Sequence, residues 1–197
     1  DEVYEHIVYA PNKHIYMQAL EGMRERTIVC NSLSKTYSIT GWRLGYVIAN
    51  PQIIDRVKKV HDFLTVGAAA PLMEAAVVGL EFGDGYYDEL AAHYAHMKEV
   101  FVGGLKKLGL KYTDPQGAYY VLVDVSEFGV KDDVKFCEWM TQFVGVAAVP
   151  GSSFFREDVH NLVRFHFAKQ DDTLNEAIKR LATLKEKAMN AKNVDWR

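Results

Sequence analysis

The sequence predicts an α/β protein in two parts, in which short buried strands and amphipathic helices follow one another. Two runs rich in β-branched residues, at 26–30 and 43–49, have the composition of buried strands. Apolar residues recur at three- and four-residue steps over 86–108, which predicts a long helix. Residues 161–168 alternate strictly between two faces, which predicts a strand in the second part.

Further helices are predicted in the first part. Asn50 can cap a helix at 51–63, and a proline suits the first position of that helix. A loop of small residues separates it from a second predicted helix at 71–80. The long helix stops at Gly109, after two lysines in its last turn. The apolar stripe of the first helix consists of Ile53, Ile54, Val57 and Val60.

The second part mixes strands and helices. Residues 110–124 predict a turn and then an aromatic strand, and 146–155 predict a buried strand that runs into a loop. Asp132 and Asp133 can cap a helix that continues to Phe143. The remaining predictions are the strand at 161–168, an amphipathic helix at 171–185 and a frayed polar tail at 190–197.

Composition limits the classes of function. With 197 residues, 49% of them hydrophobic, the chain can bury a substantial core. A net charge of −3 and scattered basic residues favour no nucleic-acid partner. Cys30 and Cys137 have no metal or disulfide spacing, so we predict two core cysteines in a reducing compartment and no metal site. The sequence has no signal peptide and no apolar run of membrane length, which favours a cytoplasmic protein without a membrane partner.

Residues 31–46 concentrate the chemistry of the chain in one turn-rich segment between two predicted strands. Lys35 is a candidate nucleophile, because a partly desolvated amine can attack a carbonyl carbon. Arg43 supplies a planar cation suited to a phosphate group. Taken alone, a Ser-x-Ser-Lys sequence is far more typical of a polar loop with a solvated lysine than of a reactive amine. The hydroxyl donors of the segment include those of Ser32, Ser34 and Ser38.

Arg164 is the other unusual cation. It lies in the middle of the apolar strand at 161–168, where a charged side chain is costly unless it is paired. An edge strand or a salt bridge would each explain its position.

The extended pattern around Lys35 resembles the cofactor attachment signature of class I/II aminotransferases, which are fold-type I enzymes. Residues 32–35 read Ser-Leu-Ser-Lys, and residues 41–45 read Gly-Trp-Arg-Leu-Gly. The resemblance implies that Lys35 is the catalytic residue and binds pyridoxal 5'-phosphate covalently. The residues that hold the cofactor phosphate would be Ser32, Ser34 and Arg43.

The first residues of the chain also match this family, whose Asp-x-x-Tyr motif corresponds to Asp1 and Tyr4. The resemblance implies that Asp1 binds the pyridine nitrogen and keeps it protonated, so that the ring can accept electrons. Tyr4 would place its hydroxyl near the ring oxygen. Without the resemblance, the pair reads as a surface acid and a packed tyrosine.

Three segments of the second part match family motifs that surround the substrate. Residues 115–119 resemble the Pro-x-Gly-x-[Phe/Tyr] segment, and 146–155 resemble the Val-x-Pro-Gly-x-x-Phe segment beside the active-site mouth. Arg164 coincides with the arginine that binds the substrate α-carboxylate through two parallel hydrogen bonds. This residue would fix the substrate class without choosing among side chains.

The resemblance covers essentially the whole chain and matches the C-terminal half of the family. It implies the C-terminal part of the cofactor-binding large domain at 1–82, with a mixed, mainly parallel sheet. A bridging helix at 83–109 and a small α+β domain at 110–197 would follow. A chain of this extent is expected to expose a sheet edge and apolar faces.

The implied activity is transfer of the amino group of an L-amino acid to a 2-oxo acid, in a homodimer with biosynthetic roles. Residues 61–65 and 165–169 are most similar to the kynurenine and methionine-type branch, which implies aromatic, sulfur-containing or glutamine-like donors. Two alternatives stay open: a pyridoxal-phosphate-dependent β-C–S lyase on the same fold, and a non-catalytic aminotransferase-like sensor domain.

Overall fold

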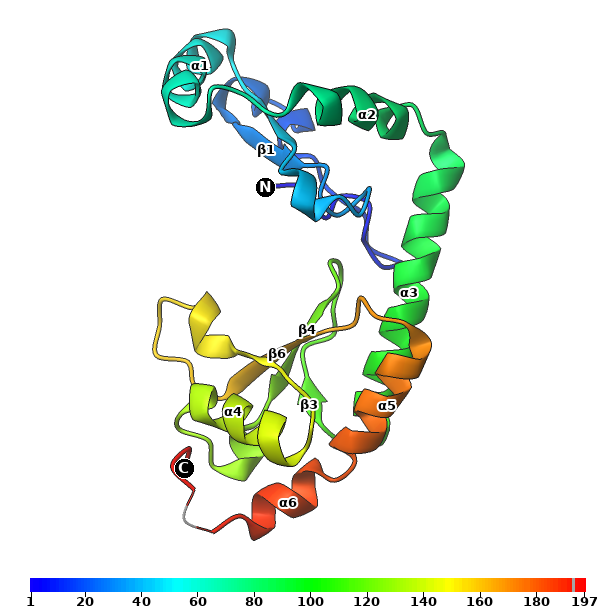
Figure 1. Cartoon of the computed structure of the whole chain (residues 1–197), viewed down its shortest axis with the longest axis vertical. Helices are drawn as coiled ribbons and strands as arrows, with labels where there is room; N and C mark the ends of the chain where they lie inside the picture. The colour runs from blue at the N-terminus through cyan, green and yellow to red at the C-terminus, as the bar shows by residue number, and fades with distance from the viewer. Residues whose placement is uncertain (193) are drawn as a thin grey trace. The chain divides into compact units, whose positions relative to one another are not determined.

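The computed structural model describes residues 1–192 and 194–197, and the chain forms two compact units, Asp1–Ala92 and His93–Arg197 (Figure 1). The boundary falls inside a long helix, α3 (Asp84–Lys107), which contributes to both units. The division into 1–82, 83–109 and 110–197 therefore stays a prediction, while the mixed α/β class is confirmed.

The first unit is built on a two-stranded sheet of β1 (Val29–Ser32) and β2 (Gly45–Ile48), which pair antiparallel from Val29 opposite Ile48 to Ser32 opposite Gly45. The expected mainly parallel sheet is not found in the described residues. Turns and a 3-10 helix connect the two strands, whereas a parallel pair is usually joined by an α-helical crossover.

Two helices follow β2, and their apolar faces are largely exposed. In α1 (Pro51–Thr65), Asn50 caps the first turn by accepting a hydrogen bond from the Gln52 amide, as predicted. The predicted apolar stripe is not a buried one, because Val60 is 59% exposed and no residue of α1 is buried. Cys30 is also exposed, contrary to the prediction of a core cysteine. With α2 (Ala70–Leu80), these residues give the unit the exposed apolar faces that the resemblance implied.

The end of α3 agrees with the sequence. Gly109 adopts a left-handed conformation with φ of +64°, and the Leu110 amide donates to the Leu105 carbonyl. This arrangement satisfies carbonyl groups at the helix end and turns the chain towards β3.

The second unit contains a four-stranded antiparallel sheet in the order β3-β4-β6-β5 (Figure 1). The alternation predicted for 161–168 is confirmed, because Val163, Phe165 and Phe167 are buried and Arg164 is half-buried. The strands are β3 (Lys111–Tyr112), β4 (Tyr120–Asp124), β5 (Val149–Pro150) and β6 (Leu162–His166), and the helices are α4 (Asp133–Phe143), α5 (Asp171–Leu181) and α6 (Leu184–Asn190).

The predicted frayed tail is wrong for the described residues near the C-terminus. Trp196 is 1% exposed and packs edge-to-face against Phe136, with ring centroids 5.1 Å apart. Arg197 donates to the carbonyl of Ala188 at 2.6 Å. An aromatic side chain at the end of a polar segment therefore anchors it to the core, because burial of the ring outweighs the polarity of its neighbours.

Within residues 1–192 and 194–197, no helix combines the length and apolar character that a membrane span needs.

Two neighbouring glycines of α3 provide a matched test of the packing in the second unit. A Cβ added to Gly104 would lie 2.5 Å from side-chain atoms of Ile178 on α5, whereas a Cβ on Gly103 would meet nothing within 4 Å. We predict that Gly104→Ala lowers the free energy of unfolding by about 1–3 kcal/mol through overpacking. Gly103→Ala should raise it by up to about 1 kcal/mol, because alanine favours the helix interior. Urea unfolding of both variants measures the difference, and equal effects would contradict the packing described here.

Candidate active site

The turn between β1 and β2 brings the predicted phosphate-binding hydroxyls together. The hydroxyl oxygens of Ser32 and Ser34 lie 2.6 Å apart, and the Ser34 amide donates to Ser32 Oγ at 3.2 Å. Ser34 is buried and Ser32 is half-buried. Burial and mutual hydrogen bonding fix the direction of both hydroxyls, so that they form one small cluster of donors.

Lys35 follows this cluster directly and contacts a hydroxyl group rather than a carboxylate. Its Nζ lies 3.5 Å from Thr40 Oγ1, to which it donates a long hydrogen bond. Thr40 in turn donates to the Ser34 carbonyl at 3.1 Å. Among the residues that the structure describes, no carboxylate forms an ion pair with Lys35. The amine is therefore not committed to a salt bridge and is available for chemistry.

Arg43 completes the turn in an unusual conformation. Its φ of 57° lies in the left-handed region, which is uncommon for a residue with a side chain. The guanidinium donates from Nη1 to the Thr40 carbonyl at 2.9 Å and is exposed. Thr40 thus contacts both Lys35 and Arg43, and connects the predicted nucleophile with the predicted phosphate ligand. Sequence reasoning assigned no role to Thr40.

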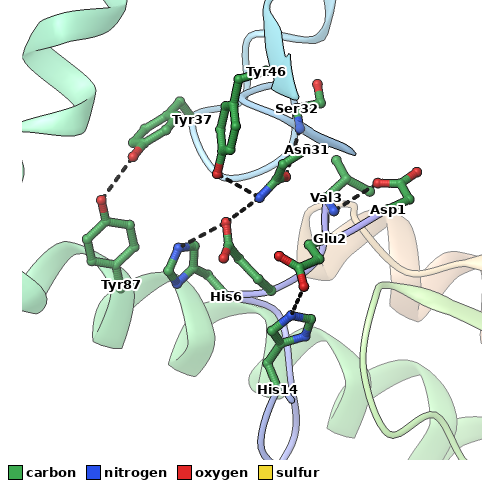
Figure 2. A network of polar contacts seen from close by, with 11 residues as sticks. Asp1, Glu2, Val3, His6, His14, Asn31, Ser32, Tyr37, Tyr46 and Tyr87 are labelled. Atoms are coloured by element: carbon green, nitrogen blue, oxygen red, sulfur yellow. Dashed lines mark hydrogen bonds and ion pairs between the residues drawn. The ribbon is translucent and has the colours of Figure 1, made fainter. Parts of the chain in front are cut away.

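The Asp1–Tyr4 segment lies against the first strand. The Glu2 amide donates to the Cys30 carbonyl at 3.0 Å, which attaches the segment to β1. Asp1 is exposed and accepts a hydrogen bond from the Val3 amide at 3.1 Å (Figure 2). Tyr4 is half-buried, and its carbonyl accepts from the Ile7 amide. The two motifs that the sequence singled out in this part of the chain are therefore neighbours in space.

A single amide side chain, which sequence reasoning missed, connects these two motifs (Figure 2). Asn31 is 8% exposed, and its Nδ2 donates to Glu5 Oε1 at 2.6 Å and to the Tyr46 hydroxyl at 2.9 Å. Its Oδ1 accepts from the Ser32 amide at 2.7 Å. Burial, followed by the negative charge of Glu5, raises the pKa of Tyr46, so its hydroxyl stays protonated. The available signal was position, because Asn31 and Glu5 directly flank the two motifs.

A pair of tyrosines attaches the Lys35 turn to the start of α3. The hydroxyls of Tyr37 and Tyr87 lie 2.9 Å apart, as Figure 2 shows. The Tyr86 hydroxyl donates to the Thr36 carbonyl at 2.6 Å. Burial, and then the hydrogen bond with Tyr87, raises the pKa of Tyr37 above its ordinary value. These contacts hold the two residues that directly follow the lysine.

Arg164 belongs to the second unit, and neither simple explanation of its position holds. Its strand is not an edge strand, because β6 pairs with β4 on one side and β5 on the other. In the described part of the chain, no carboxylate pairs with it. Its guanidinium carbon lies 4.1 Å from the ring centroid of Tyr120 and 3.7 Å from that of Phe154. Two aromatic faces hold the cation while its hydrogen-bond donors stay without an anion.

Comparison with known proteins identifies the family. The family model for aminotransferases of class I and II matches residues 1–181. The chain belongs to this family. It is 38% identical over 185 residues to the methionine aminotransferase of Escherichia coli, covering 93% of this chain and 48% of that protein. It is 34% identical over 197 residues to the kynurenine–oxoglutarate transaminase 3 of Homo sapiens, covering 90% of this chain and 43% of that protein.

Solved structures agree with this assignment. The structure of N-succinyldiaminopimelate aminotransferase from Mycobacterium tuberculosis matches with a TM-score of 0.87 and 34% identity. The match covers 93% of this chain and 48% of that one. The chain spans about half the length of the curated relatives that it matches.

The residues of this aminotransferase-family chain fit the family's cofactor, pyridoxal 5'-phosphate. Two serine hydroxyls and a guanidinium in one turn form a donor set typical of phosphate binding. Lys35 follows the hydroxyls directly and has no acidic partner among the described residues. No group of three or more His, Cys, Asp or Glu side chains within 1–192 and 194–197 is arranged to hold a metal ion.

The connection through Asn31 can be tested without any ligand. We predict that Asn31→Ala speeds hydrogen exchange of the Ser32 amide, because this amide then loses its side-chain acceptor. It should also lower the free energy of unfolding by about 1–3 kcal/mol, since the Tyr46 hydroxyl and the partly buried Glu5 carboxylate lose their shared partner. Exchange is measured by NMR, with Asn12→Ala as a matched control because its amide donates only within its own loop. Unchanged exchange at Ser32 would contradict the role of Asn31.

Proposed function

We propose that this chain supports pyridoxal-phosphate-dependent transfer of an amino group from an L-amino acid to a 2-oxo acid. The observation that carries the proposal is the setting of Lys35. The residue is half-buried, its amine has a hydroxyl rather than a carboxylate as its partner, and it directly follows two serines whose hydroxyls are clustered. Membership of the aminotransferase family supports the same conclusion.

Each predicted site residue of the first unit has a role in this proposal. Ser32, Ser34 and Arg43 bind the cofactor phosphate. Asp1 would hold the pyridine nitrogen of the cofactor in its protonated form, and Tyr4 would hold the ring oxygen through its hydroxyl. When bound, pyridoxal phosphate supplies a ring that takes up the electron pair left on the substrate after loss of the α-proton.

Lys35 has two tasks in the proposed reaction: it holds the cofactor in the absence of substrate, and it moves the α-proton. An amine suits the second task because it can accept a proton at Nζ and return it to a neighbouring atom. Thr40 keeps Nζ within the turn without neutralising it by a salt bridge. The donation from Arg43 to the Thr40 carbonyl keeps this turn in place.

Arg164 recognises the substrate α-carboxylate in this proposal. The support is its missing anion, since the cation lies between two rings with no acidic partner in the described residues. Guanidinium and carboxylate groups form two parallel charge-assisted hydrogen bonds. Every amino acid presents this carboxylate, so Arg164 selects the class of substrate and leaves the choice of side chain to other groups.

We also propose aromatic, sulfur-containing or glutamine-like amino donors. Relatives named as methionine aminotransferase and kynurenine–oxoglutarate transaminase support this range. A cytoplasmic homodimer, in which each subunit completes its neighbour's site, is proposed on the family resemblance.

Covalent labelling tests the role of Lys35 directly. We predict that pyridoxal phosphate followed by borohydride places a stable label on Lys35, found by peptide mass spectrometry. Lys35→Arg should abolish that label, whereas Lys13→Arg, in an exposed loop, should leave it unchanged. A label spread evenly over several lysines would contradict the proposed site.

The reaction products distinguish an aminotransferase from a lyase. Release of pyruvate and ammonia from a cysteine conjugate, instead of a 2-oxo acid with the substrate's own side chain, would indicate a lyase.

A further inference from the structure

The second unit contains a buried carboxylate that the proposed chemistry does not use. Asp133 is the first residue of α4, and its side chain is completely buried. One oxygen accepts from the Ser152 amide at 2.8 Å, and the other from His160 Nδ1 at 3.0 Å. The second ring nitrogen of His160 lies 2.7 Å from Asp158 Oδ1, so the imidazole lies between two carboxylates.

The charges of this cluster stabilise one another. Burial by itself raises the pKa of Asp133, but hydrogen bonds from the Ser152 amide and from His160 outweigh it, and the pKa lies below its ordinary value. Hydrogen bonds to Asp133 and then to Asp158 raise the pKa of His160. A buried carboxylate with both oxygens occupied holds its partners in one geometry, because losing either bond leaves a charge unsatisfied.

One of those partners belongs to the turn that carries Phe154. The 3-10 helix Gly151–Phe154 follows β5 directly, and Asp133 holds it through the Ser152 amide. On its other side, Gly151 packs so closely against the backbone of Leu162 on β6 that a side chain would not fit. The turn is therefore fixed from two directions. Two residues after Ser152, the ring of Phe154 lies 3.7 Å from the Arg164 guanidinium carbon.

We propose that Asp133 and His160 are positioning residues that hold Phe154 against the guanidinium of Arg164, and that this contact sets how tightly the site binds the substrate carboxylate. Asp133 acts through the Ser152 amide, and His160 keeps Asp133 oriented. The ring of Phe154 stacks on the guanidinium. The N–H donors lie along the edge of the guanidinium, and this stacking leaves them free to bind an anion. The statement about carboxylate affinity rests on the proposed function, whereas the statement about Phe154 does not.

The first test measures the exposure of Arg164 in the full chain without cofactor or substrate. Phenylglyoxal modifies accessible arginines, and peptide mass spectrometry gives the rate at each one. We predict that Asp133→Asn and His160→Ala each raise the rate at Arg164 about two- to fivefold relative to exposed Arg56, because the stacking contact is lost. Phe154→Ala should give the same rise. Adding Asp133→Asn to Phe154→Ala should give no further increase, because both act through one contact.

A matched control separates positioning from general loss of stability. Met140→Ala removes a completely buried side chain from the same helix, and this side chain takes no part in the hydrogen bonds of Asp133 with Ser152 and His160. It should destabilise the unit and leave the rate at Arg164 unchanged. A rise with Met140→Ala equal to that with Asp133→Asn, or no rise with Phe154→Ala, would overturn the proposal. Because His160 is partly exposed, His160→Ala decides the question if Asp133→Asn does not fold.

The second test uses transamination by the cofactor-loaded chain. Asp133→Asn and His160→Ala should raise KM for the amino donor about two- to fivefold and leave kcat nearly unchanged, since the carboxylate contact exists before and during the reaction. A fall in kcat in both variants, with KM unchanged, would refute the link to carboxylate affinity. If the wild-type chain transfers no amino group, the proposed function fails, and the phenylglyoxal rates still decide whether the pair positions Phe154.

Discussion

The arrangement of the first unit depends on the side chain of Asn31. A two-stranded antiparallel sheet with four residues in each strand is marginal by itself, so the Lys35 turn needs support from outside the sheet. Asn31 gives this support by binding Glu5, the Tyr46 hydroxyl and the Ser32 amide at once (Figure 2). Because the amide is nearly buried, each of these bonds has little competition from water. The segment at the start of the chain and the lysine turn are therefore held as one structure.

Local patterns predicted the elements of the fold well and their burial less well. The cap at Asn50, the stop at Gly109 and the alternation of 161–168 depend on neighbouring residues, and all three were found. The exposure of Cys30 and the anchoring of Trp196 depend on which surfaces meet in three dimensions. Local patterns in one sequence do not show which surfaces will pack against each other. The antiparallel pairing of β1 with β2 also depends on the tertiary structure, because the segment between them forms turns and a 3-10 helix instead of a crossover helix.

The candidate site likewise combines residues that the local sequence singled out with residues that it did not. The grouping of Ser32, Ser34, Lys35 and Arg43 was predictable because they lie within one short segment, which the structure closes through Thr40. Asn31, Thr40 and Asp133 were not, because polar residues of these types occur in most loops and only their partners show what they do. In both units the predicted residue and its support come from different elements. Arg164 lies on β6, whereas Phe154, one of the two rings that stack on it, belongs to a turn held by α4.

The central claim is that Lys35 moves the α-proton of an amino acid. Incubation of the pyridoxal-phosphate-loaded chain with L-methionine in D₂O, followed by NMR of the α-position, measures this transfer directly. The account predicts exchange of the α-proton by the wild-type chain and none by Lys35→Arg. Exchange that persists in Lys35→Arg, or its absence in a wild-type chain shown to carry the cofactor on Lys35, would contradict it.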